Sequence, residues 1–262
     1  MAMTRNDIKN YFVMAILILS AVGMVQNQAF AATFPNIGTD SLHSETKNLK
    51  YGFTTTHPHI GAATNFAVLG ASTITNTGNT IIVGNMGISP GTAITGFPPG
   101  SVTGTTYTTN SLVAHARTDA ASTYRSLSSA MCRTQESDAA DIGGQTLSPG
   151  VFCFPSSAAI TGTITFSGNG VYILKIGSSL TTAAGNSHVV LTNGATADNV
   201  FWVVGSSATL GTNSDFKGTI IAFSSITANT GATVEGRLIA IIDAITLDTN
   251  HITISTAYSN KN

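Results

Sequence analysis

The sequence predicts an all-β solenoid with one helix, and three observations support this fold class. Between Val200 and Thr253 the chain repeats one unit three times, with about eighteen residues from one hydrophobic strand to the next. Such a unit can bury its apolar side only by stacking on its neighbours. The 26 glycines and the many short β-branched runs indicate turns between short strands. Residues 111–131 contain no Gly or Pro and are rich in Ala, which favours a helix.

The first 31 residues have the organisation of a secretory signal peptide. Arg5 and Lys9 precede an apolar run from Tyr11 to Val25, which is followed by the small-residue site Ala29-Phe30-Ala31. We expect cleavage after Ala31 and a secreted or cell-surface location without stable membrane insertion of the mature chain. The alternative is an uncleaved anchor, although the run is shorter than the ~20 residues that a span needs. The mature chain is then expected to comprise a flexible extension (32–62), a solenoid domain (63–256) and a C-terminal tail (257–262).

Export to an oxidising compartment would permit the two cysteines, Cys132 and Cys153, to form a disulfide. Closing this loop would stabilise the fold by ~3 kcal/mol in the chain-entropy model. The alternative is two free buried thiols. A zinc site would need four ligands, and no His stands at metal spacing from either Cys.

Composition argues against several classes of function. Eleven basic against twelve acidic residues give a net charge of -1, which does not provide the basic surplus that nucleic-acid binding needs. Gly87-Ile88-Ser89-Pro90-Gly91 fits the G-x-S-x-G pattern of serine hydrolases, but Pro90 has no N–H to donate to an oxyanion. A polysaccharide-degrading β-helix would need clustered acids and bases on one face, whereas Glu136, Asp138 and Asp141 lie in a loop and the other acidic residues are scattered. We therefore expect no catalytic residue, metal site or cofactor.

Residues 111–131 have the apolar spacing of an amphipathic helix, and Thr109 or Asn110 is placed to cap its first turn. The expected apolar stripe consists of Leu112, Ala116, Ala120, Tyr124, Leu127 and Met131. One set of strands, around 171–174, 200–203, 219–222 and 237–240, is apolar on both alternating sides, so its outer side must also be covered. The helix is expected to cover it.

A second set of strands alternates between inward and outward positions. Ile160, Leu180, Ala208, Ile226 and Ile245 are expected to point inward, and Thr161, Thr181, Thr209, Thr227 and Thr246 to point outward. A third set exposes charges at Asp215, Lys217, Glu235 and His251. On the second set, stacked threonines would form a flat array that orders water; the alternative is that Thr is simply a good strand residue. The candidate contact residues are Thr161, Thr163, Ser179, Thr181, Ser207, Thr209, Ser225, Thr227, Asn229 and Thr246.

Several characteristic motifs lie between Asn65 and Ser255: NFAVLGASTITNTG, GISPGTAITGFPPGSVTG, DIGGQTLSPGVF, AAITGTITF, VFWVVGSSATLGTNSDFKGTIIAFSSITANTGATVEGR and AITLDTN. Together they resemble the microbial ice-binding protein family of secreted antifreeze proteins. The resemblance implies a right-handed, discontinuous β-solenoid of triangular cross-section with one long helix alongside, in which the N-terminal coil packs next to C-terminal coils.

The resemblance also implies a function. It is adsorption to an ice crystal surface through a flat solenoid face, giving thermal hysteresis or inhibition of ice recrystallisation, and we expect a monomer. Thr227-Ala228-Asn229-Thr230 resembles the Thr-Ala-x-Thr pattern of some members, whereas Thr246-Leu247-Asp248-Thr249 departs from it and places a carboxylate near the array. The alternative function is an exported structural or adhesive module that binds glycans or neighbouring proteins through the same face.

Overall fold

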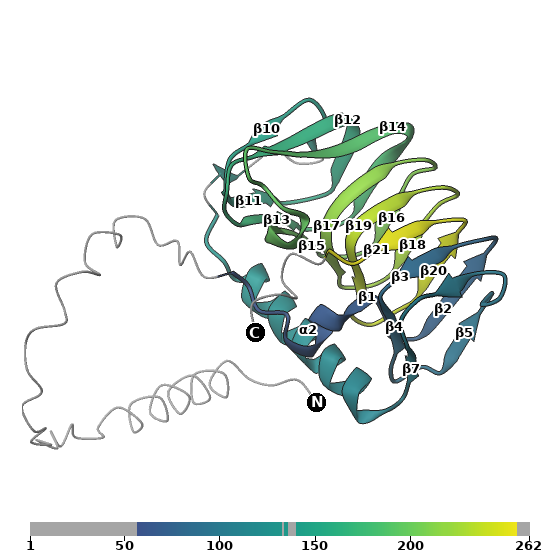
Figure 1. Cartoon of the computed structure of the whole chain (residues 1–262). Helices are drawn as coiled ribbons and strands as arrows, with labels where there is room; N and C mark the ends of the chain where they lie inside the picture. Colours follow the sequence, from purple (N-terminus) through teal and green to yellow (C-terminus); the bar gives the residue numbers. More distant parts are fainter. Residues whose placement is uncertain (1–56, 133, 136–139, 256–262) are drawn as a thin grey trace, which may run out of the picture. The chain divides into compact units, whose positions relative to one another are not determined.

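The computed structural model describes residues 57–132, 134–135 and 140–255 (Figure 1). The expected signal peptide, most of the expected extension and the expected C-terminal tail lie outside the described residues. Within the described part of the chain, no helix combines the length and the apolar character that crossing a bilayer requires.

In this part of the chain, 21 strands form one curled parallel sheet in which each coil contributes strands to three stacks. The helix face consists, in stacking order, of β8 (Thr134–Gln135), β11 (Gly150–Phe154), β13 (Tyr172–Ile176), β15 (Val200–Val204), the second parts of β17 (Asp215–Ala222) and β19 (Thr233–Ala240), β1 (Phe66–Gly70), β4 (Asn85–Ile88) and β7 (Thr106–Thr108). The fold class predicted from sequence, a β-solenoid with one helix, is confirmed.

The two other stacks have the same architecture. The threonine face consists of β9 (Ala140–Asp141), the first parts of β12 (Ala158–Ser167) and β14 (Leu180–Thr192), β16 (Ala208–Leu210), β18 (Ile226–Ala228), β20 (Ile245–Asp248), β2 (Thr73–Thr77) and β5 (Ala93–Thr95). The charged face consists of β10 (Thr146–Leu147), the second parts of β12 and β14, the first parts of β17 and β19, β21 (His251–Thr253), β3 (Ile81–Val83) and β6 (Ser101–Val102).

The order of the coils in space differs from their order in the sequence. On the three faces, Val68 pairs with Leu238, Ile74 with Ile245 and Ile82 with Ile252, so the N-terminal coils stack on the C-terminal coil. In Figure 1 the blue strands β2 and β5 continue the row formed by β16, β18 and β20. The chain then reaches the opposite end of the stack through α2 and begins the next coils at β8. This is the discontinuous arrangement that the resemblance implies.

Apolar side chains fill the solenoid because each strand directs alternate residues inward. Trp202, Phe166 and Phe216 pack together in the interior: the Trp202 ring centroid lies 5.6 Å from that of Phe166 and 4.9 Å from that of Phe216. The strands of the helix face are buried on their outer side as well, where Phe201, Ile221 and other residues form a second cluster with α2. This explains why their sequences are apolar on both sides.

Helix α2 (Ser111–Ser128) covers that outer side, as the sequence predicts. The Asn110 side chain accepts a hydrogen bond from the Val113 N–H at 3.0 Å, which confirms Asn110 as the cap. The expected stripe is wrong in part. The buried residues are Val113, Ala116, Ala120, Thr123 and Leu127, whereas Leu112 is 41% exposed, and Met131, beyond the end of the helix, is 75% exposed.

The position of the helix follows from the surface beneath its first turn. A Cβ at Gly87 would lie 2.5 Å from the Phe66 ring and 2.8 Å from Val113 Cγ2. The missing side chain at Gly87 therefore lets Phe66 and Val113 pack together, which turns Val113 rather than Leu112 toward the sheet. Thr123 is buried because its hydroxyl donates to the carbonyls of His59 and Asp119, both at 2.9 Å.

Residues 57–62 differ from the expected flexible extension. Ile60 is 4% exposed, and the short helix η1 (Gly61–Asn65) lies against α2, where the Ala62 N–H donates to Asp119 Oδ2 at 2.8 Å. The polar and glycine-containing sequence of this segment gave no periodic signal of this packing. The packed domain therefore begins before residue 63.

A buried ion pair holds the same region on the solenoid. Arg237 Nη1 lies 2.8 Å from Asp198 Oδ1, and the two side chains are 3% and 5% exposed. Asp198 belongs to the short helix η2 (Ala197–Asn199), and Arg237 Nε donates to the Thr64 carbonyl at 3.1 Å. The pair thus connects three segments that are distant in the sequence.

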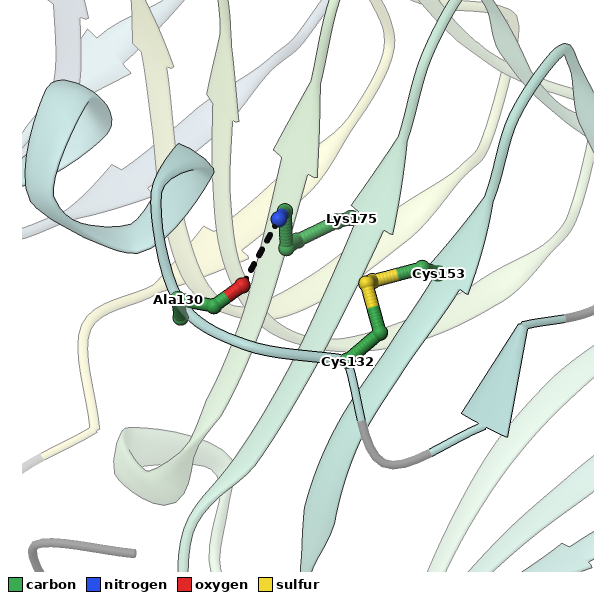
Figure 2. Close-up of a disulfide and its surroundings, with 4 residues drawn as sticks. All are labelled: Ala130, Cys132, Cys153 and Lys175. Atoms are coloured by element: carbon green, nitrogen blue, oxygen red, sulfur yellow. Dashed lines mark hydrogen bonds between the residues drawn. A yellow bond between two sulfur atoms is a disulfide. The ribbon is translucent and has the colours of Figure 1, made fainter. Parts of the chain in front are cut away.

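Two links attach the end of α2 to the solenoid (Figure 2). The expected disulfide between Cys132 and Cys153 is present, with a Cα–Cα distance of 5.7 Å. Lys175 Nζ donates to the Ala130 carbonyl at 2.8 Å, and a cation is favourable at this negative end of a helix. Both links lie on the helix face.

Candidate functional site

Strand register on the threonine face produces one unbroken column of threonines. Thr95 pairs with Thr75, Thr75 with Thr246, Thr246 with Thr227, Thr227 with Thr209, and Thr209 with Thr181. All of them are exposed or half-exposed. In β2, β14, β16, β18 and β20 the residues on either side of these threonines are buried, as Ile74 and Asn76 are in β2. The column therefore stands on a packed interior.

Two residues expected on this face lie elsewhere. The partner of Thr181 on β12 is Ala159 and not Thr161. On its other side, Ala159 pairs with Asp141 of β9. Sequence alignment matched Ile160 with Leu180 because both are large and apolar, but the true partner of Leu180 is the small Ala158. Thr161 therefore lies further along the strand, at the bulge where the register shifts.

Thr163 is the second of these residues. It pairs with His188, which in turn pairs with Asp215 of the charged face. The threonine column consequently ends at Thr181, and Ala159 and Asp141 occupy the next two positions.

Hydroxyl groups also form a row beside the column. Ser179, Ser207 and Ser225 directly precede the inward residues of their strands, as the sequence predicts. The Oγ atoms of Ser207 and Ser225 lie 3.0 Å apart, and so do those of Ser157 and Ser179. These contacts fix the hydroxyls along the edge of the face. On the opposite side of the column, Asn229 is half-buried and follows β18.

Sequence reasoning missed the contribution of the N-terminal coils to this face. Thr73, Thr75 and Thr77 lie on β2, and Thr95 lies on β5. The alternation Thr-x-Thr-x-Thr was a visible signal. The expected site contains only coils that are consecutive in the sequence, whereas β2 stacks on β20 although the two strands are far apart in the chain.

Charged groups lie at the margins of the column. At the end of the stack, the N–H groups of Gly143 and Thr161 donate to Asp141 Oδ1 at 2.9 and 3.0 Å. These two hydrogen bonds, first that from Gly143, hold the pKa of the Asp141 carboxyl below its usual value. On the charged face, Lys217 Nζ lies 3.2 Å from Asp215 Oδ1 and 3.5 Å from Glu235 Oε2. The charged face thus differs in chemistry from the threonine face.

The described residues contain no group of three or more His, Cys, Asp or Glu side chains that could hold a metal ion. A cleft of about 430 Å³ lies beside the disulfide and is lined by residues including Tyr124, Phe154 and Lys175. It belongs to the helix side of the domain and not to the threonine face.

Fold and surface together define a class of protein: a three-sided, discontinuous β-solenoid with one lateral helix and one side rich in hydroxyl groups. The Ice-binding-like family matches residues 68–253, and the chain belongs to this family. The relatives of this chain in the family are ice-binding proteins, and ice-binding proteins are not enzymes.

Similar proteins agree with this assignment. The chain is 42% identical to an ice-binding protein of Nostoc sp. (strain HG1), over 86% of this chain and 82% of that protein. Its fold is similar to the crystal structure of an ice-binding protein from an Antarctic biological consortium, with a TM-score of 0.73 and 41% identity over 76% of this chain and 91% of that one. It is also similar to the ice-binding protein of the Antarctic ascomycete Antarctomyces psychrotrophicus, with a TM-score of 0.74 and 38% identity over 76% of this chain and 99% of that one.

Proposed function

We propose that this protein binds ice crystals through the threonine face and is an exported antifreeze protein. The observation that carries the proposal is the unbroken column Thr95, Thr75, Thr246, Thr227, Thr209 and Thr181. Stacked strands place such residues ~4.8 Å apart, and outward residues along one strand recur every ~6.7 Å. The methyl and hydroxyl groups therefore form a regular plane that can hold water in a lattice-like arrangement.

Many weak contacts on one rigid surface explain how such a face binds without a pocket. Each threonine contributes little, but simultaneous contacts add as multivalent binding does. The side chains are already ordered by their strands and by the packed interior, so adsorption costs little conformational entropy. Adsorbed protein would restrain crystal growth, giving thermal hysteresis and inhibition of ice recrystallisation. The signal-peptide pattern of residues 1–31 supports secretion. We propose that the protein acts outside the cell as a monomer.

The test is a bulky substitution at the middle of the column. Thr227→Tyr should remove most of the thermal hysteresis and recrystallisation inhibition, because the ring would hold the plane away from the ice lattice, while the circular dichroism spectrum stays native. Thr253→Tyr is the matched control, since Thr253 is half-buried at the end of β21 on the charged face. It should keep wild-type activity.

Full activity in a natively folded Thr227→Tyr variant would refute the assignment of the face. A wild-type protein that folds correctly but neither shapes ice crystals nor shows hysteresis would favour a structural or adhesive module that binds glycans or other proteins.

A further inference from the structure

Asp248 lies at the edge of the threonine face, where β20 turns toward β21. Its Oδ2 accepts a hydrogen bond from the hydroxyl of Thr230 in the neighbouring coil, and its Oδ1 accepts one from Thr249 Oγ1 at 3.0 Å. On the other side Asp248 pairs with Thr77 of β2. The carboxylate is therefore engaged with hydroxyl groups on its own surface and does not project as an isolated charge.

The backbone at this corner is fixed by a buried asparagine. The Asp248 N–H donates to Asn250 Oδ1 at 2.7 Å, and Asn250 is 2% exposed. Asn250 Nδ2 donates to the carbonyls of Asn229 and Ala232 at 2.9 and 3.2 Å, and the Asn250 N–H donates to Thr80 Oγ1 at 3.0 Å. Three successive coils are thus held together where Asp248 emerges.

Thr249 supplies a second, independent observation. It has a φ of 53°, a left-handed conformation that is costly for a β-branched residue. The adjacent corners use glycine for this conformation, Gly78 with a φ of 73° and Gly231 with a φ of 74°. A Cβ at Gly78 would lie only 2.2 Å from Thr249 Oγ1, so the hydroxyl of Thr249 occupies the space that Gly78 leaves open. The corner retains a hydroxyl group where glycine would be easier to accommodate.

We propose that Asp248 is a positioning residue of the ice-binding face, which orients the hydroxyls of Thr230 and Thr249 beside the middle of the threonine column. Each hydroxyl directs its proton to the carboxylate, which leaves its oxygen lone pairs available to water of the ice lattice. Because these rotors are ordered before binding, their contacts with ice cost less entropy. This inference rests on the proposed function. Under it, Asp248 contributes to the ice-binding face even though it departs from the Thr-Ala-x-Thr pattern.

The experiment compares thermal hysteresis and melting temperature in matched variants. Asp248→Ala and the near-isosteric Asp248→Asn should lower hysteresis about twofold, as expected when a few of many simultaneous contacts are lost, with little change in melting temperature. An amide has one acceptor oxygen and cannot hold both hydroxyls in the same way. The double variant Thr230→Val/Thr249→Val keeps both β-branched shapes and should give the same loss.

The control and the triple variant separate this role from a general effect of charge. Asp215→Ala removes an aspartate that accepts from Thr233 Oγ1 at 3.2 Å on the charged face, and it should leave hysteresis unchanged. Adding Asp248→Ala to the Thr230→Val/Thr249→Val variant should cause no further loss, because Asp248 acts through these two hydroxyls.

Unchanged or increased hysteresis in the Asp248 variants would overturn the inference, and so would a further loss in the triple variant. If Asp248→Ala fails to fold, the Thr230→Val/Thr249→Val variant decides: full activity there overturns the inference. The proposed function fails separately, through full activity of Thr227→Tyr. Loss of activity in Thr227→Tyr together with wild-type activity in the Asp248 variants would retain ice binding and reject the role of Asp248.

Discussion

Removing the disulfide is expected to lower stability without affecting the ice-binding face. Cys132 and Cys153 are separated by 21 residues in the sequence. In the chain-entropy model, opening a loop of this length lowers the free energy of unfolding by ~3 kcal/mol. For a domain of this size each kcal/mol corresponds to about 2–4 °C, so Cys132→Ser/Cys153→Ser should melt roughly 6–12 °C lower than the wild type.

The position of the disulfide explains why activity should persist. Cys153 is 7% exposed on β11, a strand of the helix face. The Lys175 hydrogen bond to the Ala130 carbonyl continues to hold the end of α2 when the disulfide is absent. The threonine column consists of other strands, so its spacing does not depend on the covalent link. Hysteresis is measured near the freezing point, where the variant remains folded.

The assay is thermal melting followed by circular dichroism, together with hysteresis of the same samples. Wild-type protein with reductant should melt with the serine variant, and wild-type protein without reductant should melt higher. Equal melting temperatures in all three samples would refute the loop-closure reasoning. A loss of hysteresis in a variant that is fully folded at the assay temperature would show that the disulfide shapes the threonine face. Lys175→Met, with the disulfide intact, measures the second link alone.

Three further predictions concern the ends and the interior of the stack. Ala159→Thr continues the column beyond Thr181 and should raise hysteresis above that of the wild type at an unchanged melting temperature; equal or lower hysteresis would indicate that this coil does not contact ice. Arg237→Met leaves the Asp198 carboxylate buried without its partner, so it should lower the free energy of unfolding, measured by denaturant titration, by about 3–5 kcal/mol. The double variant Arg237→Met/Asp198→Asn should lower the free energy of unfolding by less, because no unpaired charge stays buried. Because the pKa of Asp141 is lowered in the folded state, its contribution to stability is complete above about pH 3.9 and is lost as the pH falls through that lowered pKa. On acidification the melting temperature of the wild type should therefore fall further than that of Asp141→Asn. Parallel profiles of melting temperature against pH for the two proteins would contradict this.

Much of the fold could be predicted because the solenoid imposes a local period. The strands of the helix face are apolar on both sides, and the alternation around Thr209 and Thr227 follows from the two-residue period of a strand. The cap could be narrowed to Thr109 or Asn110 because a polar residue before an apolar-periodic segment is a local signal; the structure shows that it is Asn110. These features depend on residues that are close in the sequence.

The errors arise where a contact depends on a distant segment. The helix stripe differs in part from the expected one because Gly87 of β4 and Phe66 of β1, on two stacked coils, decide that Val113 rather than Leu112 packs against the sheet. Thr161 is misplaced because a bulge shifts the register between β12 and β14, which pattern matching cannot detect. The packing of Ile60 depends on an interface with α2 that no periodicity in residues 57–62 indicates.

The discontinuity of the chain also determines where the middle of the threonine column lies. If the coils stacked in sequence order, β20 would form an open edge, and Thr246 would be the last residue of the array. Because β2 pairs with β20, Thr246 instead lies between Thr227 and Thr75, and its strand is paired on both sides. An unpaired edge strand is a site of fraying and aggregation, so the N-terminal coils protect the same strand that they extend. The most central part of the column is therefore built by two segments from opposite ends of the domain, and it exists only when both are folded together.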